Sequence, residues 1–298
     1  MPELPEVEIV KQSLDKNIKF QKIKKVVIRN RNLRFKISKD FEFFLTNKKI
    51  VRISRKSKYL ILHLSNNTFC IVHLGMSGTI HLLDKNNFIN NTNSSFYNSP
   101  NLPSKHNHIE IFLKKCRLIY NDPRRFGFIK IFKNKKTLLK FFNNIGPEPL
   151  NKKFNINYIF DYFINKKKNI KSFLLDQKFV SGIGNIYASE ILFNCKINPF
   201  KQAKNLTKLD IKKIRYFSKV ILNKAIKKGG SSIRDFKNVL GQDGSFQNEF
   251  KVYQRENLNC LNKDCFGKIT KKIISKRSTF FLQQVPKINN YFIDHSIF

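Results

Sequence analysis

The chain has 298 residues, of which 58 are Lys or Arg and 20 are Asp or Glu, giving a formal net charge of +38. This length can bury a sizeable core and favours two domains. A balance this basic is hard to reconcile with a small neutral substrate and indicates a polyanion partner, with nucleic acid first among them. The excess is mostly lysine and comes with many Asn, Ile and Phe residues, so an AT-rich coding sequence is an alternative origin of the charge.

Targeting signals and disulfides are not evident in the sequence. No stretch of about 18 uncharged apolar residues occurs, and the first residues lack the apolar segment of a signal peptide. The five cysteines are an odd number without a disulfide framework. We therefore expect a soluble protein of the reducing cytoplasm with no membrane attachment.

The first six residues, MPELPE, contain a candidate nucleophile. A proline at position 2 permits removal of the initiator methionine, which leaves the secondary amine of Pro2 close to Glu3 and Glu6. An N-terminal amine has a pKa of about 7.7–8.0 against about 10.4 for lysine, so its neutral fraction at pH 7 is roughly a hundredfold larger. Attack on a sugar or carbonyl carbon would give an iminium directly. The alternative is an ordinary helix start, in which the two glutamates favour the first turn.

The N-terminal half predicts one helix followed by a β-rich region. Apolar residues recur at three- or four-residue intervals from Pro5 to Asn17, which indicates a helix. Eight short runs that alternate or are wholly apolar then favour a two-layer β-sandwich. The predicted strands are 25–28, 50–53, 59–63, 68–73, 79–83, 109–113, 117–120 and 128–132. The segment 84–104 is rich in Asn, Ser and Pro and is predicted to be an exposed loop.

The composition changes at residues 145–150, IGPEPL, whose two prolines and glycine indicate an interdomain connection. Beyond it the pattern predicts three or four packed helices and then short β-like pieces. The predicted helices are 158–166, 170–175, 185–193, 208–228 and 232–238. The β-like pieces are 251–253, 268–274 and 279–282.

Three short motifs of the β-rich half each have a functional and an ordinary interpretation. Lys58 is either a second catalytic amine or phosphate contact, or part of a solvated strand edge. The turn HLGMSG at 73–78 presents Met76 either as a core residue or as an apolar wedge for a base stack. The turn NDPRRFG at 121–127 presents Arg124 and Phe126 either as ordinary surface residues or as a phosphate contact and an inserted side chain.

The helical half contains weaker signals. Lys171 and the segment GIGN at 182–185 indicate a helix–turn–helix with glycine in its turn, where backbone N–H groups could hold a phosphate. Asn185 is a suitable N-cap for the helix that follows. Cys260 and Cys265 are separated by four residues, and only His295 follows as a further His or Cys. Since a structural zinc needs four ligands, the alternative is a hairpin held by its apolar residues at 280–282.

Together these motifs resemble those of bacterial formamidopyrimidine-DNA glycosylases, in the same order, from residue 1 to about Lys287. The resemblance rests on the octet MPELPEVE, on Lys58, and on the segments 73–78, 122–127, 146–150 and 182–190. The octet and residues 184–190 are individually specific. Leu4 favours this branch over the related endonuclease VIII group, which usually has glycine there.

The resemblance implies an α+β fold in three parts. An N-terminal two-layer β-sandwich with an N-terminal helix precedes a helical domain with a helix–two-turn–helix motif, and a C-terminal β-hairpin finger follows. The implied divisions are a catalytic domain at 1–144, a linker at 145–153, a helical DNA-binding domain at 154–250, a degenerate finger at 251–287 and a tail at 288–298.

The same resemblance implies a bifunctional base-excision repair enzyme. It would remove oxidised purines, chiefly 8-oxoguanine and formamidopyrimidines, from double-stranded DNA and then nick the strand by β,δ-elimination. By position, Pro2 would attack C1′ of the damaged nucleotide and form a Schiff base. Glu3 would be the general acid/base, with Glu6 supporting it. Lys58 would assist β-elimination and Arg277 δ-elimination.

The resemblance also implies seven DNA contacts. Three residues would fill the gap left by a flipped base: Met76, Arg124 and Phe126. Lys171 and Asn185 would contact DNA phosphates. His106 and Lys166 would make further contacts to the DNA. The segment 241–250 would lie over the flipped lesion.

No cofactor is expected for the chemistry, because the amine itself carries the covalent step. The resemblance implies one structural zinc, held by two Cys-x2-Cys pairs. This chain departs from that pattern: Cys260 and Cys265 are spaced by four residues, and Leu282 and Val285 occupy the positions of the second pair. The expected protein is a monomer of the bacterial cytoplasm that associates with the nucleoid and binds DNA containing oxidised purines or abasic sites.

Two alternatives belong to other functional classes. One is a non-catalytic protein that binds lesions or abasic sites and is derived from such an enzyme. The other is a general basic nucleic-acid-binding or ribosome-associated protein, which would show a steep salt dependence and no preference for damaged DNA.

Overall fold

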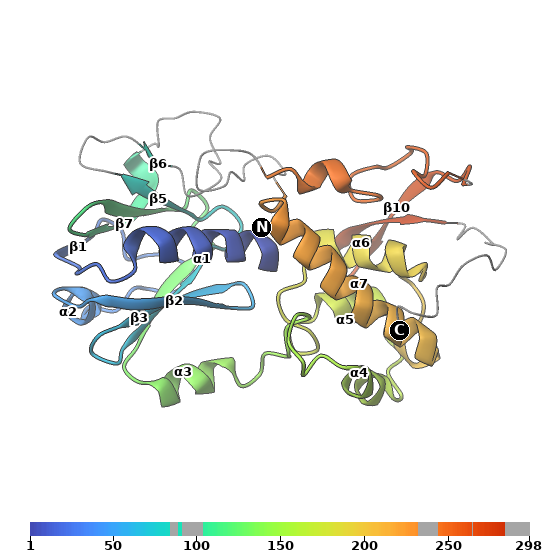
Figure 1. Ribbon diagram of the computed structural model, residues 1–298, viewed down its shortest axis with the longest axis horizontal. Helices are drawn as coiled ribbons and strands as arrows, with labels where there is room; N and C mark the ends of the chain where they lie inside the picture. Colours follow the sequence, from blue (N-terminus) through green and yellow to red (C-terminus); the bar gives the residue numbers. More distant parts are fainter. Residues whose placement is uncertain (84–88, 91–103, 232–243, 264, 284–298) are drawn as a thin grey trace.

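The computed structural model of the chain has two lobes, with the N-terminus between them (Figure 1). The structure describes residues 1–83, 89–90, 104–231, 244–263 and 265–283. Within these ranges, no helix combines the length and the apolar character that crossing a membrane requires.

The N-terminal lobe consists of two antiparallel sheets and the helix α1 (Leu4–Ile18). One sheet has the order β1-β7-β8-β5-β6, and the other has the order β2-β3-β4-β9. The strands are β1 (Lys25–Ile28), β2 (Ile50–Lys56), β3 (Tyr59–Leu64), β4 (Phe69–His73), β5 (Thr79–Leu83), β6 (Ile89–Asn90), β7 (Asn107–Phe112), β8 (Arg117–Asn121) and β9 (Phe128–Phe132). Apolar residues of α1 and of both sheets form one core, as the predicted two-layer sandwich requires.

The predicted helix and all eight predicted strands occur, with small shifts at their ends. Three short elements were missed: α2 (Phe41–Leu45), α3 (Lys135–Phe142) and the 3₁₀ turn η1 (Ser104–His106). The helix α3 follows the last strand and begins at an Asn134 cap, whose side chain accepts a hydrogen bond from Thr137 N. Most of the predicted loop 84–104 lies outside the described residues, although β6 within it pairs with β5.

The second lobe contains α4 (Ile156–Phe163), α5 (Ile170–Leu175), α6 (Asn185–Cys195) and α7 (Lys208–Lys227), with 3₁₀ turns at Ala203–Asn205 and Phe246–Glu249. Four of the predicted helices are confirmed, and the fifth, 232–238, lies outside the described residues. Asn155, Asn169 and Thr207 cap the starts of α4, α5 and α7 with side-chain acceptors. The apolar faces of these helices share a second core. Because α1 contacts both β2 and α7, it joins the two lobes.

The chain then forms the finger hairpin, in which β10 (Ile269–Ile274) pairs with β11 (Arg277–Leu282). The prediction of a β-like piece at 251–253 is wrong. These residues form turns, and their three backbone N–H groups donate to the carboxylate of Glu190 on α6 at 2.8–3.0 Å. The buried carboxylate of Glu190 therefore takes the place of the carbonyl acceptors that a neighbouring strand would supply.

Candidate active site and nucleic-acid interface

The carboxylate of Glu3 lies at the N-terminus of α6, in the other lobe. It accepts hydrogen bonds from the backbone N–H groups of Gly184 (2.6 Å) and Ile186 (2.9 Å). A Cβ on Gly184 would lie 2.4 Å from the Glu3 carboxyl carbon, so only glycine leaves room for this approach. Two predictions are therefore corrected. The N-cap of α6 is Gly184, not Asn185, and the N–H groups expected to hold a phosphate hold a carboxylate of the chain itself.

Glu6 is equally buried and is held from three sides. Its carboxylate accepts hydrogen bonds from the Tyr187 hydroxyl at 2.6 Å, from Ser231 N at 2.9 Å and from Glu3 N at 2.9 Å. Neither Tyr187 nor Ser231 was predicted as a site residue. They lie 181 and 225 residues from Glu6, so no local pattern in the sequence marks them.

The terminal amine, which in this structure is that of Met1, lies within electrostatic reach of Glu3, Glu6, Lys58 and Arg277. Burial lowers the pKa of the terminal amine, and the two glutamates oppose this shift. Burial also lowers the pKa of Lys58, which is 6% exposed, against the opposing effect of Glu3. The pKa of Glu3 is raised by burial, opposed by Lys58 and supported by Glu6. The site thus combines two amines of lowered pKa with a carboxyl group of raised pKa.

A cleft of about 780 Å³ opens beside the terminal amine. Met76 and Phe126 project into it with 48% and 45% of their surface exposed, although both are apolar. Arg124, whose guanidinium lies 4.7 Å from the centre of the Phe126 ring, also lines the cleft. The remaining lining residues are Met1, Asn32, Leu33, Arg34, His73, Gly75, Arg125 and Arg277. Four arginines and the exposed side chains of Met76 and Phe126 suit a partner that is both anionic and stacked.

Asp122 fixes the two loops that carry these side chains. Its carboxylate accepts hydrogen bonds from Ser77 Oγ (2.6 Å) in one loop and from Gly127 N (2.8 Å) in the other. The loops touch at their backbones, since a Cβ on Gly75 would lie 2.4 Å from Gly127 N. The sequence identified this aspartate only as part of a turn; its role in aligning Met76 with Phe126 depends on the pairing of distant strands.

The other four predicted DNA contacts have different surroundings. Lys171 is fully buried and donates to Ser278 O at 3.1 Å and to Thr279 Oγ1 at 2.8 Å. Asn185 Nδ2 donates to the same Ser278 carbonyl at 2.8 Å. Both residues therefore hold β11, next to Arg277. His106 ends η1, and Lys166 follows α4 with its Nζ 5.8 Å from the centre of the Tyr162 ring. None of the four residues is among those that line the cleft.

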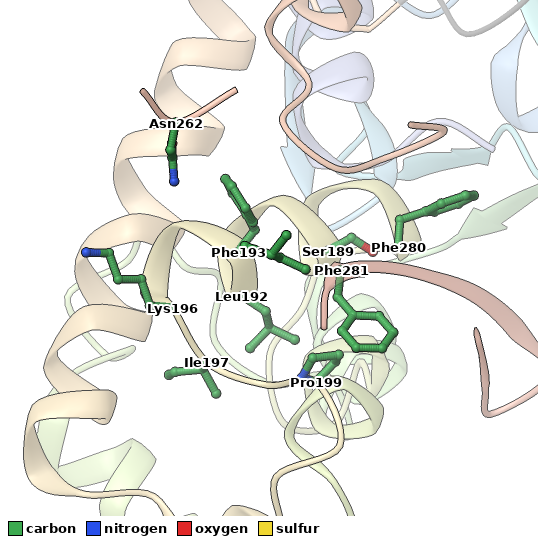
Figure 2. Close-up of a pocket in the computed structure, with 10 residues that line it drawn as sticks. Ser189, Leu192, Phe193, Lys196, Ile197, Pro199, Asn262, Phe280 and Phe281 are labelled. Carbon is green, nitrogen blue, oxygen red and sulfur yellow. The ribbon is translucent and has the colours of Figure 1, made fainter. Parts of the chain in front are cut away.

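A second pocket lies between α6 and the finger (Figure 2), and it shares no lining residue with the cleft. Its lining is mainly apolar: Ser189, Leu192, Phe193, Lys196, Ile197, Pro199, Asn262, Phe280, Phe281 and Leu282. The last three residues belong to β11 and are almost fully buried. Apolar packing on α6, together with the Glu190 contacts to residues 251–253, thus joins the finger to the helical lobe.

Comparisons with known proteins agree with this geometry. Residues 1–129 match the family model of the formamidopyrimidine-DNA glycosylase N-terminal domain, and residues 145–237 match that of the formamidopyrimidine-DNA glycosylase H2TH domain. The chain belongs to the formamidopyrimidine-DNA glycosylase family. Relatives with that name include one from Wolbachia pipientis subsp. Culex pipiens, 40% identical over 94% of this chain and 98% of its own length. Another, from Rickettsia bellii, is 39% identical over 96% of this chain and its full length.

Solved structures of the family have the same fold. A Lactococcus lactis FPG (MutM) complex with FAPY-dG-containing DNA has a TM-score of 0.82 and 33% identity, over 96% of this chain and all of its own. A complex between Lactococcus lactis Fpg and abasic-site-containing DNA gives 0.83 and 33% over the same shares. The α+β fold class predicted from the sequence is therefore confirmed.

The described residues of the finger do not fit the zinc that the family resemblance implied. Leu282 occupies a position expected for cysteine, and it packs in an apolar cluster with Val252, Cys260, Ile269 and Phe280. Among the described residues, no group of three or more His, Cys, Asp or Glu side chains could hold a metal ion. The other replaced position, Val285, lies outside the described ranges. Two thiols and a hydrocarbon side chain cannot supply the four ligands of a structural zinc.

Proposed function

We propose that this chain is a bifunctional DNA glycosylase and abasic-site lyase that removes oxidised purines from double-stranded DNA. Its membership of the family supports the proposal, as do relatives that bind FAPY-dG and abasic-site DNA. The observation that carries it is the cluster at the lobe junction, where an amine, a carboxyl group of raised pKa and a buried lysine adjoin an arginine-rich cleft.

In the proposed reaction, removal of Met1 makes Pro2 the terminal amine. Its nitrogen bonds to C1′ as the bond from C1′ to the damaged base breaks, and the departing base takes up a proton. Glu3 supplies and removes protons during base release and opening of the sugar ring, with Glu6 holding its backbone. The open sugar is then an iminium, from which Lys58 promotes β-elimination and Arg277 δ-elimination. No metal or redox cofactor is required for these steps.

The residues that line the cleft make the proposed contacts to the DNA. Met76, Arg124 and Phe126 fill the space of the extruded nucleotide, which offsets part of the cost of unstacking. Asn185, His106 and Lys166 supply further contacts to the DNA, whereas Lys171, which is fully buried, acts by holding β11. The net charge of +38 adds a large salt-dependent attraction. The protein acts as a monomer, in the cytoplasm of its cell and at the nucleoid.

The direct test is a duplex containing one 8-oxoguanine, incubated with the protein and sodium borohydride. We expect a covalent protein–DNA adduct with the damaged duplex and none with the undamaged one. Without borohydride, the damaged strand should be cleaved. Binding to abasic DNA without adduct or cleavage would support the non-catalytic alternative. Equal binding to damaged and intact duplex would instead favour a general nucleic-acid-binding protein.

We further propose that packing, not zinc, stabilises the finger. Metal analysis of the purified protein should find far less than one zinc per chain, and a zinc chelator should leave both the melting temperature and strand cleavage unchanged. Leu282→Ala should destabilise the finger by about 2–5 kcal/mol, because it removes a buried leucine. One tightly bound zinc per chain would contradict this proposal.

A further inference from the structure

Lys58 stands in an unusual turn. The strands β2 and β3 are joined by the two residues Ser57 and Lys58, since Lys56 pairs directly with Tyr59. Ser57 has a φ of 57°, in the left-handed region that side chains other than Gly and Asn seldom adopt. Two-residue hairpins with positive φ at this position normally use glycine. The backbone that presents Lys58 is therefore strained, and the surrounding structure must hold it.

Three side chains bind all the polar groups of Ser57. Its N–H donates to the carboxylate of Glu148, and its carbonyl oxygen accepts from Arg55 Nη1 at 2.9 Å. Its hydroxyl donates to Gln177 Oε1 at 3.4 Å. Ser57 and Lys58 are both buried, so these contacts replace water as partners of the turn.

The holding residues come from three separate parts of the chain. Glu148 lies in the connection between the lobes and forms a two-pronged ion pair with Arg55, at 2.9 and 3.0 Å. Arg55 Nε donates in addition to Glu8 of α1 at 2.7 Å. Gln177 lies between α5 and α6, where its side chain accepts from Gly182 N at 2.8 Å and donates to Ile183 O at 2.9 Å. The turn is thus fastened to the connection, to α1 and to the entrance of α6.

We propose that Glu148 and Gln177 are positioning residues for Lys58. Acting through Ser57, they stabilise the strained turn, so that Lys58 reaches its place near Glu3 only when the two lobes are docked. Neither residue needs to touch DNA for this role. The inference rests on the proposed function of Lys58 in the lyase reaction.

The test uses Glu148→Gln in the full-length protein and measures cleavage of a pre-formed abasic site. We expect kcat to fall roughly 10- to 100-fold, the scale expected when a catalytic group is displaced by about 1 Å. KM and affinity for an uncleavable abasic analogue should change little. Asp210→Asn is the matched control, because it also removes a carboxylate from a half-buried ion pair, with Lys201. This control should cleave like the wild type.

Substitutions of Ser57 separate the effect of backbone strain in the turn from the effect of losing the Glu148 charge. Adding Ser57→Gly to Glu148→Gln should raise kcat severalfold, because glycine adopts positive φ without strain. Ser57→Thr keeps the hydroxyl but opposes positive φ, and it should lower kcat with Glu148 intact. The Thr variant decides the question alone if Glu148→Gln fails to fold.

Wild-type cleavage rates in Glu148→Gln or in Ser57→Thr would overturn the inference, and so would a parallel loss of DNA affinity and kcat. A wild-type protein that cleaves no abasic DNA would instead refute the proposed function. The two failures are therefore distinguishable.

Discussion

A chain whose first residue is Pro2 should form a borohydride-trapped adduct with abasic DNA, and a chain with a blocked N-terminus should not. Both forms can come from one fusion protein that is cleaved, or left uncleaved, immediately before Pro2. The adduct yield of the uncleaved form should be sharply lower, because a proline nitrogen in a peptide bond cannot attack C1′ and the exposed lysines are mostly protonated at neutral pH.

The pH dependence of trapping gives a second readout. Burial lowers the pKa of the Met1 amine below its ordinary value of 8.0, and we expect the same direction for the Pro2 amine that replaces it. An amine is nucleophilic only when neutral, so the trapping rate should remain high below pH 8 and fall only at more acidic pH. The uncleaved fusion must first be shown to bind an uncleavable abasic analogue. Full adduct formation by a fusion that binds normally would refute the role of Pro2.

Glu3→Gln should slow the release of 8-oxoguanine by about 10²–10⁴-fold, the usual range for a positioned acid/base group. Cleavage of a pre-formed abasic site, in which the base is already gone, should be less affected. Because burial raises the pKa of Glu3, its protonated form persists to higher pH than that of an ordinary glutamate. Wild-type base release should decline as the pH rises through that pKa.

Glu190→Gln is the matched control for Glu3→Gln. Glu190 is also a buried carboxylate that accepts several backbone N–H groups, and burial raises its pKa as well. Its substitution should reduce stability, as measured by thermal unfolding, with a much smaller effect on base release. Equal rates of base release in the Glu3→Gln and wild-type proteins would exclude Glu3 as the acid/base.

Local patterns predicted most of the secondary structure. The helix after Pro5 and the strands of the sandwich follow from apolar spacing, which depends only on near neighbours in the chain. The short helices α2 and α3, of five and eight residues, were missed, although α5 with six residues was predicted. The β prediction at 251–253 failed because Glu190, more than 60 residues away, takes the backbone donors there.

The site is likewise divided into residues that the sequence predicted and residues that only the structure revealed. The N-terminal amine and its two glutamates, Met76, Arg124 and Phe126 could be proposed from residue type and from resemblance. Their supports could not. From the sequence, Asp122 was interpreted as a turn residue and Glu148 as part of the interdomain connection. The partners of these carboxylates lie far away in the chain, so the neighbouring residues do not indicate them.

The sequence by itself determined the chemical groups: a proline amine that can be freed, the carboxyl and ammonium groups to accompany it, and a strongly basic surface. Only the tertiary structure decided how those groups behave. It places the Glu3 carboxylate on the N–H groups of Gly184 and Ile186 and buries Lys58 in a strained turn. The reason is physical. Proton affinity and orientation depend on desolvation and on neighbouring charge, and both arise only when segments far apart in the chain come into contact.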